Sequence, residues 1–474
     1  MGFEAVNASV APDVAPVAPS NAPADDARPK RYDLAGALRV VRQMETSAAR
    51  GAVFAEITRK NAAYRLVDRL YTRADARFIQ PLLLFVYMLK SVLSVGPFYP
   101  EGAEAVSISQ FPNEHRTIDR VAVLVPDVRL MRLTLSHRHL LARGQCREAA
   151  IMLGSARRIF PFLRLLARSH SFMPAARIAS ALAFYIRSTR LFAGNPSLGA
   201  AIVASNYSPE AVGMVAAAHR HGRRVIYANH APVPANGAVV PPVLADCALF
   251  YGTAIRQTYE RRSRCLAEVA LIGQPGAARP MQWRDRMGTI GIFLTAGTRV
   301  DVLQSLVATI RLSFAEARII IRQHPVTLLQ TNATAIGIKD PLTKLTIGSP
   351  LDAEIAACDM VICGNSGVAL NVVSGGRPVA YLASLDEAEF DTNGFVQSRL
   401  IYAMPWWTDD LYDRLKAFYQ LPGWPAIMQT YDAAYGTDKR ELQRAAAEVL
   451  ARHLRLGPAA DVTKIPAPDL RKVA

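Results

Sequence analysis

The sequence predicts an α/β protein with two parallel-sheet domains, and three observations lead to this prediction. From about residue 121 onward, short apolar runs alternate with helical patterns, as in strands that are joined by crossover helices. The alternation occurs in two series, separated by a polar stretch with Gly and Pro at 276–287. The chain has 474 residues, enough for two such domains and an appended region. We therefore expect two Rossmann-like domains that face a cleft.

The composition is that of a globular protein with a basic surface. Hydrophobic residues make up 51% of the chain and charged residues 20%, which is enough apolar surface to form a core. The net charge of +16 favours polyanionic partners: nucleic acid, anionic lipid headgroups, or phosphorylated donors and acceptors. The five cysteines show no CxxC pair and no metal-ligand spacing, so we expect reduced core residues and no metal site.

The N-terminal part is expected to be a disordered tail followed by helices. Residues 1–30 are rich in Ala, Pro, Val and Asp and lack the order of a secretory signal, which predicts the tail. Residues 31–118 are predicted to form a helical region. Its most apolar run, Phe78 to Phe98, is interrupted by Pro81 and Lys90, so we expect a buried or interfacial helix and no membrane span. A second tail is predicted at 457–474.

The first domain is predicted at 119–276. The segment Ser208-Pro209-Glu210 supplies a cap, an N1 proline and an acid for a helix that ends near His221. An arginine-rich helical stretch runs from Arg143 to Arg190, and three interpretations remain open. It forms a solvated face of packed helices, a basic surface on anionic lipid, or the lining of an acceptor groove. The predicted strands are 121–127, 200–206, 223–230, 246–252 and 268–276.

The second domain is predicted at 288–456. Its strands are nearly continuous in Val, Ile and Leu, which is typical of a doubly wound sheet that is buried on both faces. A helical pattern at 439–456 is expected to complete it. The predicted strands are 289–297, 317–325, 344–350, 359–365 and 377–383.

Ligands of open α/β sheets bind at the carboxyl ends of the strands, so residues at these ends are the candidates for chemistry. The segment Cys-Gly-Asn-Ser-Gly at 363–367 leads from a strand into a helix. Backbone N–H groups there, with the side chains of Asn365 and Ser366, could bind phosphate, and Gly364 and Gly367 would permit close approach. The alternative is a helix that is merely capped by Asn365 or Ser366.

Two further strand ends carry a histidine. In Arg322-Gln323-His324-Pro325, His324 could bind a phosphate or a ribose; alternatively it caps loop carbonyls. In Asn229-His230-Ala231-Pro232, His230 is suited to accept a proton from a hydroxyl. The acidic group Asp386, Glu387, Glu389 and Asp391 is interpreted as a solvated loop, and Trp406 and Trp407 as core packing.

The order of these motifs resembles a known group of families. RQHP, followed after a loop by CDMVICGNSGVALNVVSGGRPVAYL, is similar to the donor-binding half of bacterial surface-polysaccharide transferases of GT-B fold. These include capsular polysaccharide transferases, CDP-glycerol glycerophosphotransferases and bacterial sialyltransferases with HP and serine motifs. The resemblance places phosphate binding on His324 and Ser366, and GRRVIYANHAPVP with LIGQPG places the acceptor-side histidine at His230. It covers about 200–383 and departs from the families at Ala231 and Gly367.

The resemblance implies a metal-independent glycosyltransferase, or a glycerophosphotransferase-like enzyme, that moves a group from a nucleotide-activated donor to a surface-polysaccharide or lipid-linked glycan acceptor. His230, or else Glu210, would be the catalytic base, with no cofactor. We expect a cytoplasmic protein without a nucleic-acid partner, peripheral to the membrane where its arginine-rich helices bind anionic lipid. The alternatives are a nucleotide-sugar epimerase of the same fold and a non-catalytic membrane- or polymer-binding subunit. The predicted donor-binding residues are Arg322, His324, Pro325, Gly364, Asn365, Ser366, Gly367, Gly297 and Thr298.

Overall fold

The computed structural model describes most of the chain between residues 34 and 454. Both predicted tails and Pro325 lie outside the described residues. The described ranges are 34–48, 62–96, 102–136, 145–236, 239–276, 278–324, 337–338, 340–346, 348–387 and 389–454.

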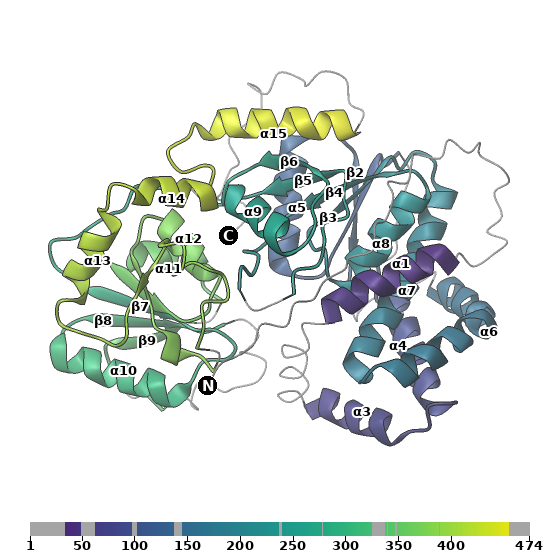
Figure 1. Ribbon diagram of the computed structural model, residues 1–474, viewed down its shortest axis with the longest axis horizontal. Coiled ribbons are helices and arrows are strands. Elements are labelled where there is room, and N and C mark those ends of the chain that lie inside the picture. The colour runs from purple at the N-terminus through teal and green to yellow at the C-terminus, as the bar shows by residue number, and fades with distance from the viewer. Residues whose placement is uncertain are drawn as a thin grey trace, which may run out of the picture. The chain divides into compact units, whose positions relative to one another are not determined.

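Several helices lie before the first strand in the chain, and others connect the first strands to one another (Figure 1). The apolar run after Phe78 forms α4 (Ile79–Leu93), which packs against α6 and α7 and buries Leu84, Met88 and Val92. It is thus a partly buried helix, as predicted. None of the described helices combines the length and the apolar character that crossing a membrane requires. The other helices of the group are α1 (Leu34–Ala48), α3 (Ala62–Arg73), α6 (Gln145–Ser169) and α7 (Phe172–Gly194).

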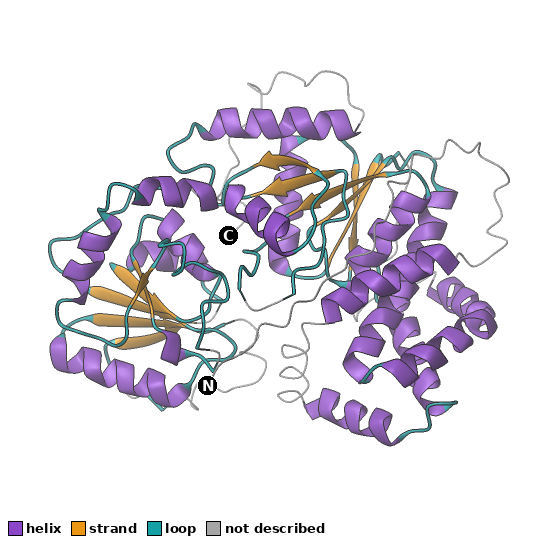
Figure 2. Ribbon diagram, viewed as in Figure 1, coloured by secondary structure: helices purple, strands orange, loops and turns teal. Residues whose placement is uncertain are grey.

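The first sheet has six parallel strands in the order β2-β1-β3-β4-β5-β6. Figure 2 shows strands as orange arrows among the purple helices. Every residue of β1, β3 and β5 is buried, because helices cover both faces. Its strands are β1 (Ala105–Ser109), β2 (Leu130–Thr134), β3 (Ala200–Val203), β4 (Arg224–Ala228), β5 (Cys247–Phe250) and β6 (Glu268–Leu271), and its helices include α5 (Pro112–Leu124), α8 (Pro209–Arg220) and α9 (Thr253–Arg262).

The strand predicted at 121–127 is wrong, because most of this segment belongs to α5. Ile118, Val121 and Leu124 are buried at intervals of three residues, which is helical spacing. Other apolar residues between them made the segment resemble a strand in the sequence. The Glu114 carboxylate accepts hydrogen bonds from the N–H groups just before the helix and so fixes its start. The first strand is β1, so the sheet begins inside the region predicted as helical and ahead of the predicted boundary at 119.

The second sheet also has six parallel strands, in the order β12-β11-β10-β7-β8-β9. Figure 1 shows α10 on one side of it and α11 and α12 on the other. The prediction of two doubly wound α/β domains is therefore confirmed. Its elements are β7 (Thr289–Phe293), α10 (Val300–Ser313), β8 (Arg318–Arg322), β9 (Thr343–Thr346), α11 (Leu351–Ala357), β10 (Met360–Cys363), α12 (Val368–Ser374), β11 (Val379–Tyr381), η4 (Ala383–Leu385), β12 (Tyr402–Ala403), α13 (Leu411–Tyr419) and α14 (Trp424–Tyr431).

The last helix returns to the first sheet. α15 (Lys439–Leu454) packs against α5 and β6, although the sequence pattern assigned it to the second domain. The crossing is fixed by Asp432, which is fully buried and accepts hydrogen bonds from the N–H groups of Gln274 (2.9 Å) and Ala434 (3.0 Å). Trp407 is buried against Phe314, in agreement with its predicted packing role.

Candidate functional site

The loops with the predicted donor-binding residues diverge from one point of the second sheet. The chain leaves β7 toward β8 on one side, whereas β10 pairs with β7 on the other side. Such a reversal of strand order is where open α/β sheets bind ligands. The loop after β7 contains Gly297 and Thr298, and the loop after β10 contains Gly364 to Gly367. The structure thus brings these two sets of residues together.

Asp386 connects the two loops. Its Oδ1 accepts hydrogen bonds from the hydroxyls of Thr295 (2.5 Å) and Thr298 (3.4 Å), and its Oδ2 accepts one from the N–H of Asn365 (2.5 Å). Only 3% of Asp386 is exposed, so its interpretation as a solvated residue is wrong. A Cβ atom at Gly364 would overlap this carboxylate. Gly364 therefore leaves room for the Asp386 carboxylate. In the sequence, the position of this acid shortly after a buried strand was the feature that could have identified it as a site residue.

Of the other acidic residues in this group, two are exposed to solvent and one has a structural role. Glu387 and Glu389 are exposed, as predicted. The half-buried Asp391 accepts hydrogen bonds from the N–H groups of Phe395 and Val396 and thus shapes its own loop.

The turn after β10 is held mainly by contacts with residues 386–392, which follow β11. The side chain of Asn365 donates to the carbonyl of Phe390 and accepts from the N–H of Thr392 (2.8 Å). The hydroxyl oxygen of Ser366 accepts a hydrogen bond from the N–H of Val368 (3.3 Å), the first residue of α12. The N-cap residue of α12 is Gly367, which has no side chain, so neither Asn365 nor Ser366 is the cap that the alternative interpretation expects. Ser366 instead supports the turn just before α12, and this helix has only seven residues. The Ser366 hydroxyl hydrogen is available for a second partner, since this bond uses only a lone pair.

Arg322 and His324 differ in what surrounds them. The Arg322 guanidinium forms an ion pair with the buried Glu354 and donates to the carbonyl of Ser349 (2.9 Å). Arg322 thus holds the end of β8 to α11. Burial lowers the pKa of His324, and the negative charge of Asp386 opposes this only in part. The imidazole is therefore mainly neutral at neutral pH, in the neighbourhood of the carboxylate that also binds Asn365.

In the first sheet, strand order reverses between β1 and β3, and His230 lies beside the loop that follows β3. Its Nδ1 is hydrogen bonded to the carbonyl of Ala204. Because a carbonyl only accepts, Nδ1 carries the proton, and in the neutral ring Nε2 is then the unprotonated nitrogen. This is the tautomer that a general base requires.

Glu210 lies in the first turn of α8 and is 2% exposed. Burial raises its pKa to about 7, with a smaller contribution from the charge of Glu114. Its Oε1 has no hydrogen-bond partner among the described residues. The predicted base Glu210 is therefore a buried carboxyl that shares the β1/β3 end of the sheet with Glu114. No three His, Cys, Asp or Glu side chains in the described part of the chain are grouped as metal ligands.

The loop after His230 contacts the second sheet's site. A Cβ atom at Gly367 would lie 3.2 Å from Cδ of Pro232, so the Pro232 ring lies close against the Gly367 backbone. Asn236 donates its N–H to the carbonyl of Thr392 (3.0 Å) and its side-chain amide to that of Asp391 (2.7 Å). The histidine-bearing loop of one sheet thus meets the glycine-serine turn of the other.

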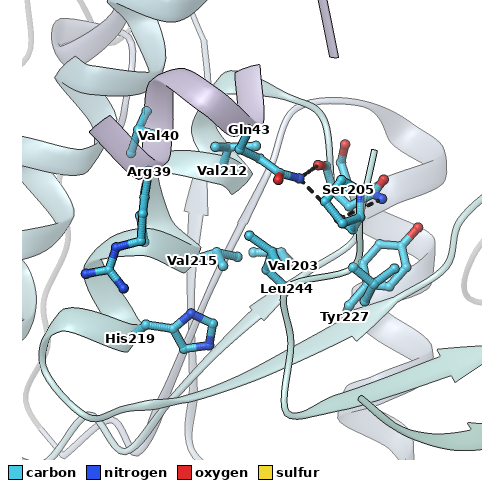
Figure 3. A pocket seen from close by; sticks show the side chains of 14 residues that line it. Arg39, Val40, Gln43, Val203, Ser205, Val212, Val215, His219, Tyr227 and Leu244 are labelled. Carbon is cyan, nitrogen blue, oxygen red and sulfur yellow. Dashed lines mark hydrogen bonds between the residues drawn. The ribbon is translucent and has the colours of Figure 1, made fainter. Parts of the chain in front are cut away.

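A separate cavity of about 50 Å³ lies between α1 and α8 (Figure 3). Its walls are mainly aliphatic, including Val203, Val212 and Val215. Gln43 lines it and donates to the carbonyls of Asn206 (3.2 Å) and Pro242 (3.1 Å). None of the predicted site residues lines this cavity, and its volume holds only a few water molecules.

Comparisons with known proteins give structural likenesses only. No protein-family model and no curated protein sequence matches the chain. A putative UDP-N-acetylglucosamine 2-epimerase from Listeria monocytogenes is similar with a TM-score of 0.48 and 11% identity, over 76% of this chain and 98% of that one. The calicheamicin glycosyltransferase CalG4 has a TM-score of 0.47 and 10% identity, over 75% and 99%. With these low values the likenesses carry no further argument, and the fold class, two doubly wound α/β domains, stands on the sheets described above.

Proposed function

We propose that this protein is a glycosyltransferase, or a glycerophosphotransferase-like enzyme, that transfers a group from a nucleotide-activated donor to a surface-polysaccharide or glycan acceptor. One observation carries the proposal: the loop that begins at His230 contacts the turn with Ser366 and Gly367 through Pro232. A proton acceptor and a phosphate-binding turn on adjacent loops are what transfer to a hydroxyl needs.

On the donor side, the Ser366 hydroxyl, the Gly367 N–H and neutral His324 would bind the donor phosphates. Gly297 and Thr298 would line the same site, held in place by Asp386. Because its guanidinium is paired with Glu354, Arg322 would fix the end of β8. These groups would stabilise the charge that develops on the leaving phosphate oxygen.

On the acceptor side, His230 would act as the general base. The acceptor oxygen attacks the transferred carbon or phosphorus atom, and its proton passes to Nε2 of His230. The bond to the leaving phosphate oxygen breaks, and the electron pair departs with the nucleotide. The Ala204 carbonyl would stabilise the imidazolium by accepting the Nδ1 hydrogen bond.

The test separates donor binding from proton transfer. We expect His230→Ala to lower turnover by about 10²–10⁴-fold, while CMP, CDP or UDP still raises the melting temperature. Ser366→Ala should weaken that nucleotide-induced shift, and Ser305→Ala, an exposed serine of α10, should change neither quantity. Unchanged turnover in both site variants would remove the proposed site. No shift with any nucleotide would favour a non-catalytic subunit.

A nucleotide-sugar epimerase is the second candidate, and the buried carboxyl of Glu210 favours it. A carboxyl whose pKa is raised to about 7 can both release and accept a proton at neutral pH, as interconversion of two sugars requires. Incubation of UDP sugars without an acceptor distinguishes the two functions. Only an epimerase converts one nucleotide sugar into another under that condition.

A further inference from the structure

The surface formed by α3, α4 and α6, called the α3–α4–α6 surface below, exposes large apolar side chains. On α4 and directly before it, Phe78 is 63%, Leu82 52% and Val86 55% exposed. They recur every four residues and therefore form one stripe along the helix. Figure 1 shows α4 between α3 and α6, with which it is in contact. Further exposed apolar residues on the three helices are Leu66, Leu70, Ile79, Leu153 and Leu165.

The opposite face of α4 is already occupied by the protein core. Leu84, Met88 and Val92 are fully buried, so α4 is apolar on both its inner and its outer side. A helix that is apolar all round is normally enclosed by protein or by lipid. The outer stripe thus indicates an apolar partner that is additional to α6 and α7.

The helices α3 and α6 and the turn before α4 carry exposed arginines that are not neutralised. None of them forms an ion pair with a carboxylate in the part of the chain that the structure describes, and Glu148, the acidic residue of α6, pairs with Arg190 instead. The nearby acids of α3 and its following turn are Asp68 and Asp75. The surface therefore carries excess positive charge. The exposed arginines are Arg65, Arg69, Arg73, Arg77, Arg157, Arg158 and Arg168.

Arg164 joins the apolar and the basic parts of the surface. Its guanidinium carbon lies 5.2 Å from the centre of the Phe78 ring, and its Nε donates to the carbonyl of Arg77 (3.0 Å). The ring is thus held at the surface beside a cation. An aromatic ring flanked by arginines is the arrangement in which the ring enters the acyl boundary while the charges stay at the headgroups.

We propose that the α3–α4–α6 surface binds the face of an anionic lipid bilayer, with the α4 stripe in the interface and the arginines at the phosphates. Charge complementarity selects this partner. A second copy of the same surface would bring like charges together, which is repulsive. A nucleic acid would use the arginines, but it offers no apolar phase for Leu82 and Val86.

Vesicle co-sedimentation with the full chain tests this. We expect binding to phosphatidylcholine vesicles that contain phosphatidylglycerol, with weaker binding to pure phosphatidylcholine and at high salt. Replacing both Arg157 and Arg158 by Gln should lower the partition coefficient about thirtyfold, since each basic residue near an anionic surface contributes about a factor of five. The matched control replaces Arg440 and Arg444, exposed on α15, by Gln.

The apolar stripe is tested in the same assay. Leu82→Ser should reduce binding about tenfold or more, and Val86→Ser should act in the same direction. Leu312→Ser, at an 89% exposed leucine of α10, is the control. Equal binding of the Leu82→Ser and Leu312→Ser variants, or equal binding to neutral and anionic vesicles, overturns the proposal. So does a stripe-dependent dimer without vesicle binding. The assay uses no donor or acceptor, so its result is independent of the proposed transferase function.

Discussion

The two sheets each bury a carboxylate where their strand order reverses, but the two carboxylates have different surroundings. Both oxygens of Asp386 accept hydrogen bonds, from Thr295, Thr298 and Asn365. Glu210 has one oxygen without a partner, and burial raises its pKa to about 7. A carboxylate with all its partners fixes geometry, whereas one that is poorly solvated holds its proton. The second sheet is thus built for positioning, and the first can exchange a proton near neutral pH.

The largest effect is expected from Asp386→Ala. The half-buried N–H of Asn365 and the Thr295 hydroxyl would lose their acceptor, which should cost about 3 kcal/mol of unfolding free energy in urea denaturation. The nucleotide-induced rise in melting temperature should also disappear, because the loops after β7 and β10 would no longer be joined. Asp386→Asn keeps one acceptor oxygen and should lose less stability and less of the nucleotide-induced rise in melting temperature. A variant Asp386→Ala as stable as the parent would contradict the positioning role.

Glu210→Gln should give a pH-dependent gain in stability. The folded-state pKa is about 7 against 4.5 for the ordinary side chain, so Glu210 ionises in the unfolded chain first as the pH rises. The parent protein should therefore lose stability between about pH 4.5 and pH 7, by roughly 3 kcal/mol at most, and stay level above that range. The Gln variant lacks this loss, and its advantage should grow across the same window.

Denaturation at a series of pH values measures this difference. Glu316→Gln, at an exposed carboxylate, is the control and should show little change in its stability difference with pH. A difference between Glu210→Gln and the parent that is the same at pH 5 and pH 8 would mean that Glu210 is charged in the folded protein.

The smallest effect is expected from Gly367→Ala, at the contact between the two sheets' loops. The new Cβ would lie 3.2 Å from Pro232, so the proline ring must shift by a few tenths of an ångström, which should cost about 1 kcal/mol. Gly423→Ala, where an added Cβ meets nothing within 4 Å, is the control for the substitution itself. If Gly367→Ala also lowers turnover while Gly423→Ala does not, the Pro232 contact is part of the site.

The amino-acid pattern predicts the elements correctly where burial is periodic and local. The βαβ unit from Ala200 to Ala228 and the strands of the second sheet follow from continuous apolar runs with caps between them. The pattern is ambiguous at Val121 and Leu124, where adjacent apolar residues fit either a strand or a helix, and packing onto β1 decides for the helix. The pattern also assigned α15 to the second sheet, whereas α15 packs on the first. A helical pattern shows which residues of the helix are buried but not which sheet they pack against.

The alternation of strands and helices can be derived from the order of the amino acids alone, and so can the loops that follow the strand ends with Ser366, His324 and His230. The folded chain was needed to see that Asp386, twenty-one positions after Asn365, binds the Asn365 N–H, and that Pro232 contacts Gly367. The physical reason is that hydrophobic periodicity records whether a side chain is buried, whereas the identity of its neighbour depends on strand order. The exposed stripe of α4 could not be predicted for the same reason, since the sequence does not show whether an apolar residue lies in the core or on the surface.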